Sequence, residues 1–537
     1  MEIDVKGHSG CQIDIVREDS DLFIFKSSYD KKYLSRLCKQ AEKQKNAFRE
    51  EYQHVRIPQI FSVNQDDEHV TIKMEYVYSR NFVEYFESAG FEQINYFIKA
   101  MILYIEKELK VSPIQRISTR VTFEKYLDVE KKVLSNSWLN NDDKIKKIMQ
   151  CCRDIFFDFA KRDFIDIPVG SCHGDLTFSN ILFNGNNYYL IDFLDSFIES
   201  PLLDIVKIRQ DSAHLWSQLM YVRPYDRLRL KIICEKIDRE IDKYFSKYNW
   251  YKQYYYLYQL LNLLRILQYA KEEKVIKYLK DEISKLLTTK PGVNIENVEA
   301  TNCSQDFTLI VPAAADDILN SDRMPYVFSL DNTGIMLCIR AVQGLELSKF
   351  DKIYFTILRK HAEEYCLEEL FKLQFKRLGL DNARLVILDA PTESQSETVY
   401  KTIIKESISG SIFIKDADGY FKTEIVKENG VAVFPLEEMK MVDPQHKSYV
   451  SIDDMYYITN IIEKKVISHF FNVGGVCFEK ATDFLCYYLR LQKETDHLCM
   501  SHIIYSMLLD KYKFRPMITK KYVDWGSEQL VKFHQYG

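Results

Sequence analysis

The chain lacks the features that mark membrane-spanning and secreted proteins. No run of about 18 apolar residues occurs, so we expect no segment to span a membrane. The first ten residues, MEIDVKGHSG, contain no apolar core of a signal peptide. The 12 cysteines form no CxxC motif and no paired spacing, which argues against disulfides and against a zinc site. The sequence therefore predicts a cytoplasmic protein with reduced thiols.

An excess of positive charge is also missing. The 73 Lys and Arg residues are outnumbered by 78 Asp and Glu residues, so the chain has no global basic field for nucleic acid. Hydrophobic residues make up 46% and charged residues 28%, which is typical of a soluble globular protein. At 537 residues the chain is too long for one ordinary core, and we expect two large domains.

Hydrophobic patterning divides the chain into two regions. The first begins with short strands and one charged helix and becomes mainly helical after about residue 82. A turn-rich break, TTKPGVN, follows at 288–294. Buried-type strands then alternate with helical stretches, which predicts a mostly parallel sheet. We therefore predict an α/β multidomain protein with domains at 1–290 and 306–537 and a linker at 291–305. The expected elements are a hairpin at 13–16 and 22–26, a helix at 33–52, and strands at 71–77, 307–311, 352–357, 384–388 and 411–414.

The most informative motif is HGDLTFSN at 173–180, followed by IDF at 191–193. Phosphoryl transfer from ATP needs a carboxylate that orients the attacking hydroxyl, and Asp175 supplies one. It also needs an amide oxygen and a second carboxylate for Mg²⁺, which Asn180 and Asp192 supply. Turns favour Asp and Asn as well, but turn chemistry alone rarely gives three typed positions at fixed spacing.

Residues 1–290 resemble the aminoglycoside phosphotransferase/choline kinase family through this motif and through PLLDIVK at 201–207. The family has a two-lobed, protein-kinase-like α+β fold. The resemblance implies that Asp175 is the catalytic base and that Asn180 and Asp192 bind Mg²⁺. It implies structural roles for two further residues, which would hold the loop by hydrogen bonds: His173 and Asp204.

The same resemblance implies an ATP site in the N-terminal strands. Lys26 ends a strand at the position of the kinase lysine that contacts the phosphates, although an exposed edge-strand lysine is the other reading. Its carboxylate partner should lie on the next helix, where we predict Glu42, and Gln40 occupies a comparable face. Glu75 and Val77 would lie in the segment that contacts adenine through its backbone.

The acceptor pocket should form from the helices after Asp204. Aromatic residues there resemble the boxes that hold a quaternary ammonium by cation–π attraction, which makes choline one candidate acceptor. Aromatic residues at helical spacing more often form a core, and that reading stays open. The residues are Trp216, Tyr221, Trp250, Tyr251 and Tyr254–Tyr256.

Residues 306–537 resemble the sugar-phosphate and choline-phosphate nucleotidyltransferases, which have a Rossmann-like sheet. The matching segments are LIVPAA at 309–314, TESQSET at 392–398, IKDADG at 414–419, IEK at 462–464 and YVDWGS at 522–527. The resemblance implies three groups of site residues. The nucleotide would contact Ala313, Ala314 and Gln395; Mg²⁺ would bind Asp416, Asp418 and Asp524; and the phosphates would be balanced by Lys464 and Arg323.

One segment, 315–326, departs from that family's nucleotide loop. It has no glycine, it carries Asp316 and Asp317, and Tyr326 follows Pro325 where the family has lysine. Arg323 is retained.

Together the two halves predict a bifunctional enzyme that makes a nucleotide-activated metabolite for bacterial surface polysaccharide or lipid decoration. The kinase would use ATP and Mg²⁺ on a small hydroxylated metabolite. The second step would use CTP, or UTP as second choice, and the choice of base rests on analogy alone. An alternative keeps only the kinase active, with a degenerate nucleotide-binding or regulatory second domain.

Overall fold

The computed structural model describes residues 11–525 except 186, 289–304, 315–323 and 440–446. The protein is a mixed α/β chain that divides into two compact units. The first comprises Met1–Glu87 and Gln93–Glu296, and the second comprises Ser88–Glu92 and Asn297–Gly537. All but one residue of the predicted linker 291–305 lies outside the described residues, as does Arg323.

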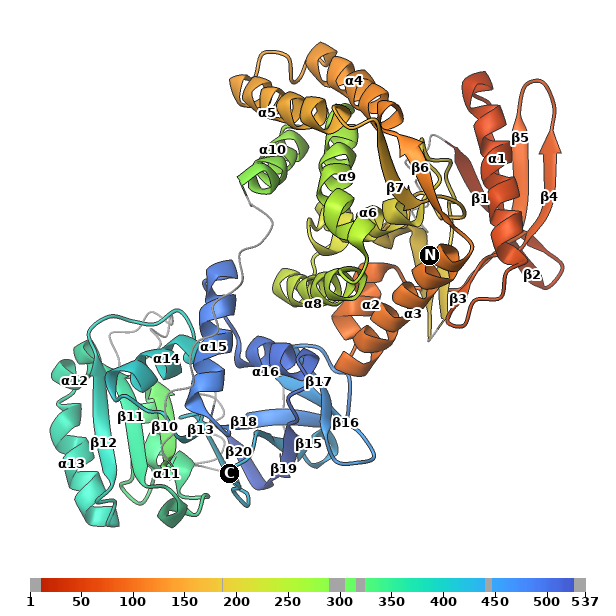
Figure 1. Ribbon diagram of the computed structural model, residues 1–537. Helices are drawn as coiled ribbons and strands as arrows, with labels where there is room; N and C mark the ends of the chain where they lie inside the picture. Colours follow the sequence, from red (N-terminus) through yellow and green to blue (C-terminus); the bar gives the residue numbers. More distant parts are fainter. Residues whose placement is uncertain (1–10, 186, 289–304, 315–323, 440–446, 526–537) are drawn as a thin grey trace. The chain divides into compact units, whose positions relative to one another are not determined.

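The first unit begins with a four-stranded antiparallel sheet in the order β1-β2-β5-β4. Helix α1 packs on this sheet through Leu37 and Ala41, which meet Val70 and Ile72 of β5 in one apolar cluster (Figure 1). The predicted hairpin and strand are confirmed, while the predicted helix ends at Phe48, four residues early. The bounds are β1 Gln12–Glu18, β2 Asp21–Ser28, α1 Lys31–Phe48, β4 Ile60–Gln65 and β5 Val70–Glu75.

The rest of the first unit is mainly helical, as expected. Two strands that the helical pattern did not predict, β6 and β7, pair antiparallel within it. The motif at 173–193 lies around a short hairpin of β8 and β9. The helices are α2 Phe82–Ser88, α3 Phe91–Lys110, α4 Thr119–Ser135, α5 Asp143–Ala160, α6 Pro201–Ser212, α7 Trp216–Leu219, α8 Arg227–Phe245, α9 Asn249–Leu267 and α10 Glu273–Thr288. The strands are β3 Val55–Arg56, β6 Ile114–Ser118, β7 Phe164–Pro168, β8 Ile181–Asn184 and β9 Asn187–Leu190.

The second unit is built on a nine-stranded sheet. The four predicted strands lie side by side and parallel in the order β12-β11-β10-β13, which confirms a parallel sheet for this part. The sheet then continues through β18, which is antiparallel to β13, and through β15 and β19. The bounds are β10 Phe307–Ala313, β11 Lys352–Leu358, β12 Ala383–Leu388, β13 Ser411–Lys415, β15 Gly430–Pro435, β16 Ser448–Ile452, β17 Ile458–Glu463, β18 Phe470–Phe478 and β19 Arg515–Ile518.

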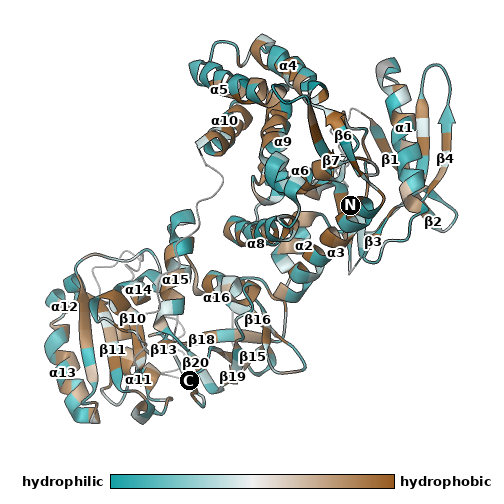
Figure 2. Ribbon diagram, in the orientation of Figure 1, coloured by the Kyte–Doolittle hydropathy of each residue, from teal (hydrophilic) through white to brown (hydrophobic). Residues whose placement is uncertain are grey.

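Helices and a small sheet surround this core. Strands β10 and β11 are mostly brown in Figure 2, because their apolar side chains are buried as is usual for parallel strands covered by helices. A separate two-stranded sheet pairs β14 with β20. The bounds are α11 Leu337–Val342, α12 Arg359–Glu364, α13 Leu367–Leu378, α14 Gln395–Lys405, β14 Gly419–Lys422, α15 Ala481–Leu491, α16 Met500–Leu509 and β20 Lys520–Asp524.

Two expectations about membranes and thiols can be compared with the described residues. In that part of the chain no helix is both long and apolar enough to cross a membrane. The cysteines described are all unpaired.

Candidate functional sites

The loop before β8 is fastened by one buried carboxylate. Asp204, on α6, accepts hydrogen bonds from the backbone N–H groups of His173 (2.6 Å) and Gly174 (2.7 Å). Burial raises the pKa of Asp204 to about 7, although these two bonds act in the opposite direction. The structure thus gives Asp204 the loop-holding position that the sequence predicted.

His173 holds the same loop from the inside. Its ring is fully buried, its Nε2 lies 2.9 Å from the carbonyl of Ile191, and its Nδ1 lies 3.2 Å from the N–H of Asp175. Burial lowers the pKa of His173 to about 4, so the imidazole is neutral at pH 7. A neutral ring that donates through Nε2 and accepts at Nδ1 satisfies both contacts.

Gly174 allows the loop to turn beside these anchors. Its φ of +86 lies in the left-handed region, and a Cβ at this position would lie 2.0 Å from the carbonyl oxygen of Leu194. Only glycine fits this backbone without a shift of its neighbours.

Asp175 and Asn180 are brought together, as the motif predicted. The amide nitrogen of Asn180 donates to Asp175 Oδ2 (3.0 Å) and to the Asp175 carbonyl (2.8 Å). Lys207 Nζ lies 3.0 Å from Asp175 Oδ1. Burial alone would raise the pKa of Asp175, but the Lys207 ammonium, the Asn180 hydrogen bond and His173 together outweigh it, and the pKa is lowered. Asp175 is therefore ionised at neutral pH, as a proton acceptor must be. Lys207 stands in the PLLDIVK segment, but no sequence signal assigned it a role.

Lys26 and Asp192 meet in the same unit. Lys26 Nζ lies 2.6 Å from Asp192 Oδ1, and the lysine is only 5% exposed, which excludes the edge-strand reading. Burial would lower the pKa of Lys26, but Asp192 reverses the effect and raises it. The predicted partner Glu42 is exposed instead.

Gln40, the alternative partner on α1, is buried. Its side-chain amide donates a hydrogen bond to the Tyr33 hydroxyl at 3.0 Å. The two predicted adenine contacts lie at the end of β5. The N–H of Glu75 donates to the carbonyl of Gln59 at 2.9 Å, and Val77 is buried.

The metal-binding expectation was tested on the donor atoms. Nowhere in the described ranges do three or more His, Cys, Asp or Glu residues form a group that could hold a metal. Mg²⁺ commonly takes only one or two protein carboxylates and completes its shell with phosphate oxygens and water. Asn180 and Asp192 would supply one amide oxygen and one carboxylate in the first unit. Asp418 and Asp524 would supply two carboxylates in the second, with Asp416 as the alternative ligand.

In the second unit, the candidate site lies where the order of the parallel strands reverses. From β12 the chain crosses to the other side of β10 and continues in β13, so the carboxyl ends of β10 and β13 are adjacent. Ligands of open α/β sheets bind at such a switch point. A cavity of about 190 Å³ lies there. Of the residues predicted from sequence, it is lined by Ala313, Gln395, Asp416 and Asp418.

Asp416 is positioned by its neighbours. Gln395, the first residue of α14, donates a hydrogen bond to Asp416 Oδ1, and the N–H of Asp416 donates to the carbonyl of Gly474 at 2.8 Å. Gly474 has a φ of +80, and a Cβ there would lie 2.2 Å from Asp416 Oδ2. The close approach of β18 to this carboxylate therefore requires glycine.

Asp418 and Asp524 come from different strand ends and face a common region. Burial and, after it, the nearby carboxylates of Asp416 and Asp524 raise the pKa of Asp418 to about 6. Lys447 Nζ lies 2.5 Å from Asp524 Oδ2. Buried Lys415 donates to the carbonyl of Gly419 at 2.6 Å, and burial lowers its pKa to about 8. The sequence motifs pointed to neither lysine.

Two predicted residues of this unit are placed differently. Lys464 is exposed, and only its backbone N–H approaches the site, by donating to the carbonyl of Lys447 at 2.9 Å. The lysine side chain that reaches Asp524 is that of Lys447. Ala314 is buried, and its carbonyl accepts from the hydroxyl of Thr392 at 3.2 Å. Tyr326 also lines the cavity.

Comparison with known proteins gave structural likeness only. No family model and no curated protein matches the chain. The nucleoside-diphosphate-sugar pyrophosphorylase of Vibrio cholerae RC9 is 13% identical, with 43% of this chain and 100% of that chain covered and a TM-score of 0.36. The inositol-1-phosphate CTP transferase of T. maritima is 12% identical, with 43% and 92% covered and a TM-score of 0.33. At these values the functional inference rests on the side chains of the protein itself.

Proposed function

We propose that the protein is a bifunctional transferase, with an ATP-dependent small-molecule kinase in the first unit and a nucleotidyltransferase in the second. One observation carries the proposal, and it is the same in both units: aspartates from separate segments lie next to lysines. In the first unit the aspartates are Asp175 and Asp192. In the second they are Asp418 and Asp524.

In the first reaction, the acceptor hydroxyl would lie against Asp175, which accepts its proton while the oxygen attacks the γ-phosphorus of ATP. The bond to ADP breaks, and Lys26 would balance the charge on the phosphates. Asn180 and Asp192 would hold Mg²⁺, which when bound neutralises phosphate charge. His173 and Asp204 act indirectly, because they fix the backbone that carries Asp175.

In the second reaction, a phosphate oxygen of the new phosphomonoester would attack the α-phosphorus of a nucleoside triphosphate and release pyrophosphate. Asp418 and Asp524 would hold Mg²⁺ near the switch point of the sheet, with Asp416 as the alternative ligand. Lys447 would balance the phosphomonoester. CTP, or UTP as second choice, is the nucleotide we propose. The product would be an activated donor for bacterial surface polysaccharide or lipid decoration.

A second candidate keeps only the kinase active. Tyr326 lines the cavity of the second unit. It follows Pro325 where the nucleotidyltransferases that the sequence resembles have lysine. A neutral side chain there favours a module that binds a nucleotide without turning it over.

The test is to incubate the pure protein with ATP, CTP, UTP, Mg²⁺ and a pool of small hydroxylated metabolites, and to read the products by mass spectrometry. A nucleotide-linked product that disappears in Asp418→Asn, while the phosphorylated metabolite accumulates, would support both steps. A phosphorylated metabolite with no nucleotide adduct in the wild type would favour the second candidate. Absence of both products would contradict the proposal.

A further inference from the structure

A small cavity lies beside the catalytic loop of the first unit. It is lined by Gly174 of the loop, by side chains of α6 and α9, and by Phe197. Its volume is about 10 Å³, which is room for about one water molecule. Because Gly174 precedes Asp175 and Lys207 contacts Asp175, an acceptor hydroxyl that reaches Asp175 would bring the adjoining part of its molecule next to the residues that line this cavity.

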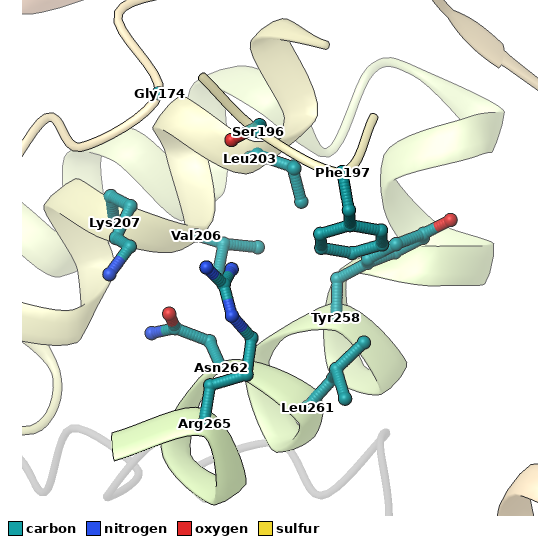
Figure 3. A pocket seen from close by; sticks show the side chains of 10 residues that line it. All are labelled: Gly174, Ser196, Phe197, Leu203, Val206, Lys207, Tyr258, Leu261, Asn262 and Arg265. Carbon is teal, nitrogen blue, oxygen red and sulfur yellow. The ribbon is translucent and has the colours of Figure 1, made fainter. Parts of the chain in front are cut away.

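Helical spacing sets the two faces of this cavity. On α6, Val206 and Lys207 follow Leu203 by three and four residues, so all three share one face. On α9, Tyr258, Leu261, Asn262 and Arg265 share one face in the same way. Figure 3 shows the side-chain nitrogen atoms of Lys207, Asn262 and Arg265 on one side of the cavity. The rings of Phe197 and Tyr258 lie on the other side of the Arg265 guanidinium.

The Arg265 guanidinium forms no hydrogen bond or ion pair within the described residues. Its Cζ lies 5.5 Å from the centroid of the Phe197 ring. Burial lowers the pKa of Arg265, and the Asp175 carboxylate is the negative charge that opposes this effect most. Further positive charge acts nearby, because Lys125 has a pKa lowered first by burial and then by Arg265. Placing a guanidinium in a half-buried position without an acceptor costs free energy, which an anionic ligand would recover.

The same charges disfavour a quaternary ammonium as the ligand of this cavity. A bound cation would face Lys207 and Arg265, and Arg265 already covers the Phe197 ring. The aromatic residues singled out in the sequence do not line this cavity, and Trp250, Tyr251 and Tyr254 are buried in the helical core.

We infer that the acceptor of the phosphotransferase site carries a carboxylate or phosphate group, which Arg265 binds while the acceptor hydroxyl faces Asp175. This inference rests on the proposed function. Lys207 stays paired with Asp175, and Asn262 stays hydrogen-bonded to Gln210 (2.8 Å), so the guanidinium is the group left to bind the anion. A charged oxygen ligand would form charge-assisted hydrogen bonds with it.

The experiment compares the wild type with Arg265→Met in the full chain. The nucleotide site is first saturated with Mg²⁺ and ADP, and inorganic phosphate or glycerate is then titrated while the unfolding midpoint is followed. We expect both anions to raise the midpoint in the wild type, and to bind about tenfold or more weakly to the variant. Arg116→Met, at an arginine with a 71% exposed side chain, is the matched control and should bind as the wild type does.

A second measurement separates this inference from the kinase proposal. ADP release from ATP is followed with glycerate, with glycerol as its neutral match, and with choline. If glycerate is turned over by the wild type and its turnover falls at least tenfold in Arg265→Met, both the kinase proposal and the inference of an anionic acceptor are supported. Turnover of choline or glycerol in preference to glycerate, or equal anion affinity in wild type and variant, overturns the inference. If no acceptor is turned over, the kinase proposal loses support and the anion titration alone tests the Arg265 site. Weaker anion binding in Arg265→Met would then support the site. Absence of anion binding to the wild type would overturn it.

Discussion

Lys26 Nζ lies 2.6 Å from Asp192 Oδ1, although 166 residues separate the two along the chain. The pair joins the N-terminal sheet to the irregular segment that directly follows β9. Asp192 has a φ of +62, a left-handed conformation that is uncommon for a residue with a side chain. Such strained backbone persists where surrounding contacts over-determine it, and it is frequent at functional sites.

We expect Lys26→Met to weaken ATP binding by about tenfold or more, because a charge-assisted contact to phosphate is lost. The measurement is the KM for ATP in the ADP-release assay, with Lys73→Met on the neighbouring strand β5 as control. Lys73 pairs with Glu18 at the edge of the sheet, so its removal should leave the KM unchanged. An equal change in both variants would show a general effect on the sheet.

Asp175→Asn should lower kcat of the kinase by about 10²–10⁴-fold, because the amide cannot accept the hydroxyl proton. Binding of ATP, measured separately by titration, should persist. Asp166→Asn, at an exposed position on β7, serves as the control. Pyrophosphate release from a supplied phosphomonoester should not change in Asp175→Asn; a parallel loss would mean that the two activities share one site.

Lys447→Met and Lys464→Met form a matched pair across one hairpin. Since Lys447 contacts Asp524 and the Lys464 side chain is exposed, only Lys447→Met should reduce pyrophosphate release, by about tenfold or more. The measurement is the steady-state rate of pyrophosphate release by each variant at a saturating concentration of nucleoside triphosphate. The reverse order of effects would restore the role that the sequence predicted for Lys464.

Asp418→Asn should change the pH dependence of stability. The folded pKa of Asp418, about 6, lies above its ordinary value, so the wild type loses stability as pH rises from about 4 to 6, where the folded state binds more protons. The variant lacks this loss. With EDTA present, the free energy of unfolding of the variant at pH 7 should exceed that of the wild type by on the order of 1–2 kcal/mol. The difference is this small because solvent still reaches the Asp418 side chain. Below pH 4 the two free energies of unfolding should be equal. A gap that does not depend on pH would refute the assignment.

The local parts of this architecture could be predicted from the sequence, and the long-range pairings could not. Apolar runs located the four parallel strands correctly, because burial on both faces leaves a composition signal. The spacing from Asp175 to Asn180 worked because five residues of loop can hold the two side chains together. Glu42 is exposed while its neighbour Ala41 is buried, because one step along a helix turns a side chain by about 100°.

The two lysines of the second unit show why the rest was missed. Lys447 and Lys464 flank the hairpin of β16 and β17, in which Ser448 pairs with Glu463. The chosen lysine was thus one strand away from the residue that reaches Asp524. Which of the two turns toward β20 depends on packing between distant segments, and this leaves no local pattern.

Gly174 and Gly474, each crowded by a neighbouring segment, allow a test of which of the two proposed activities the cell requires. Gly174 supports only the first site and Gly474 only the second, and each lacks room for a single added carbon. In a library that randomises both codons in the native host, survivors would record which activity the cell needs. Glycine retained at 174 alone would mark an organism that depends on the kinase, and glycine retained at both would mark one that depends on the complete sequence of reactions.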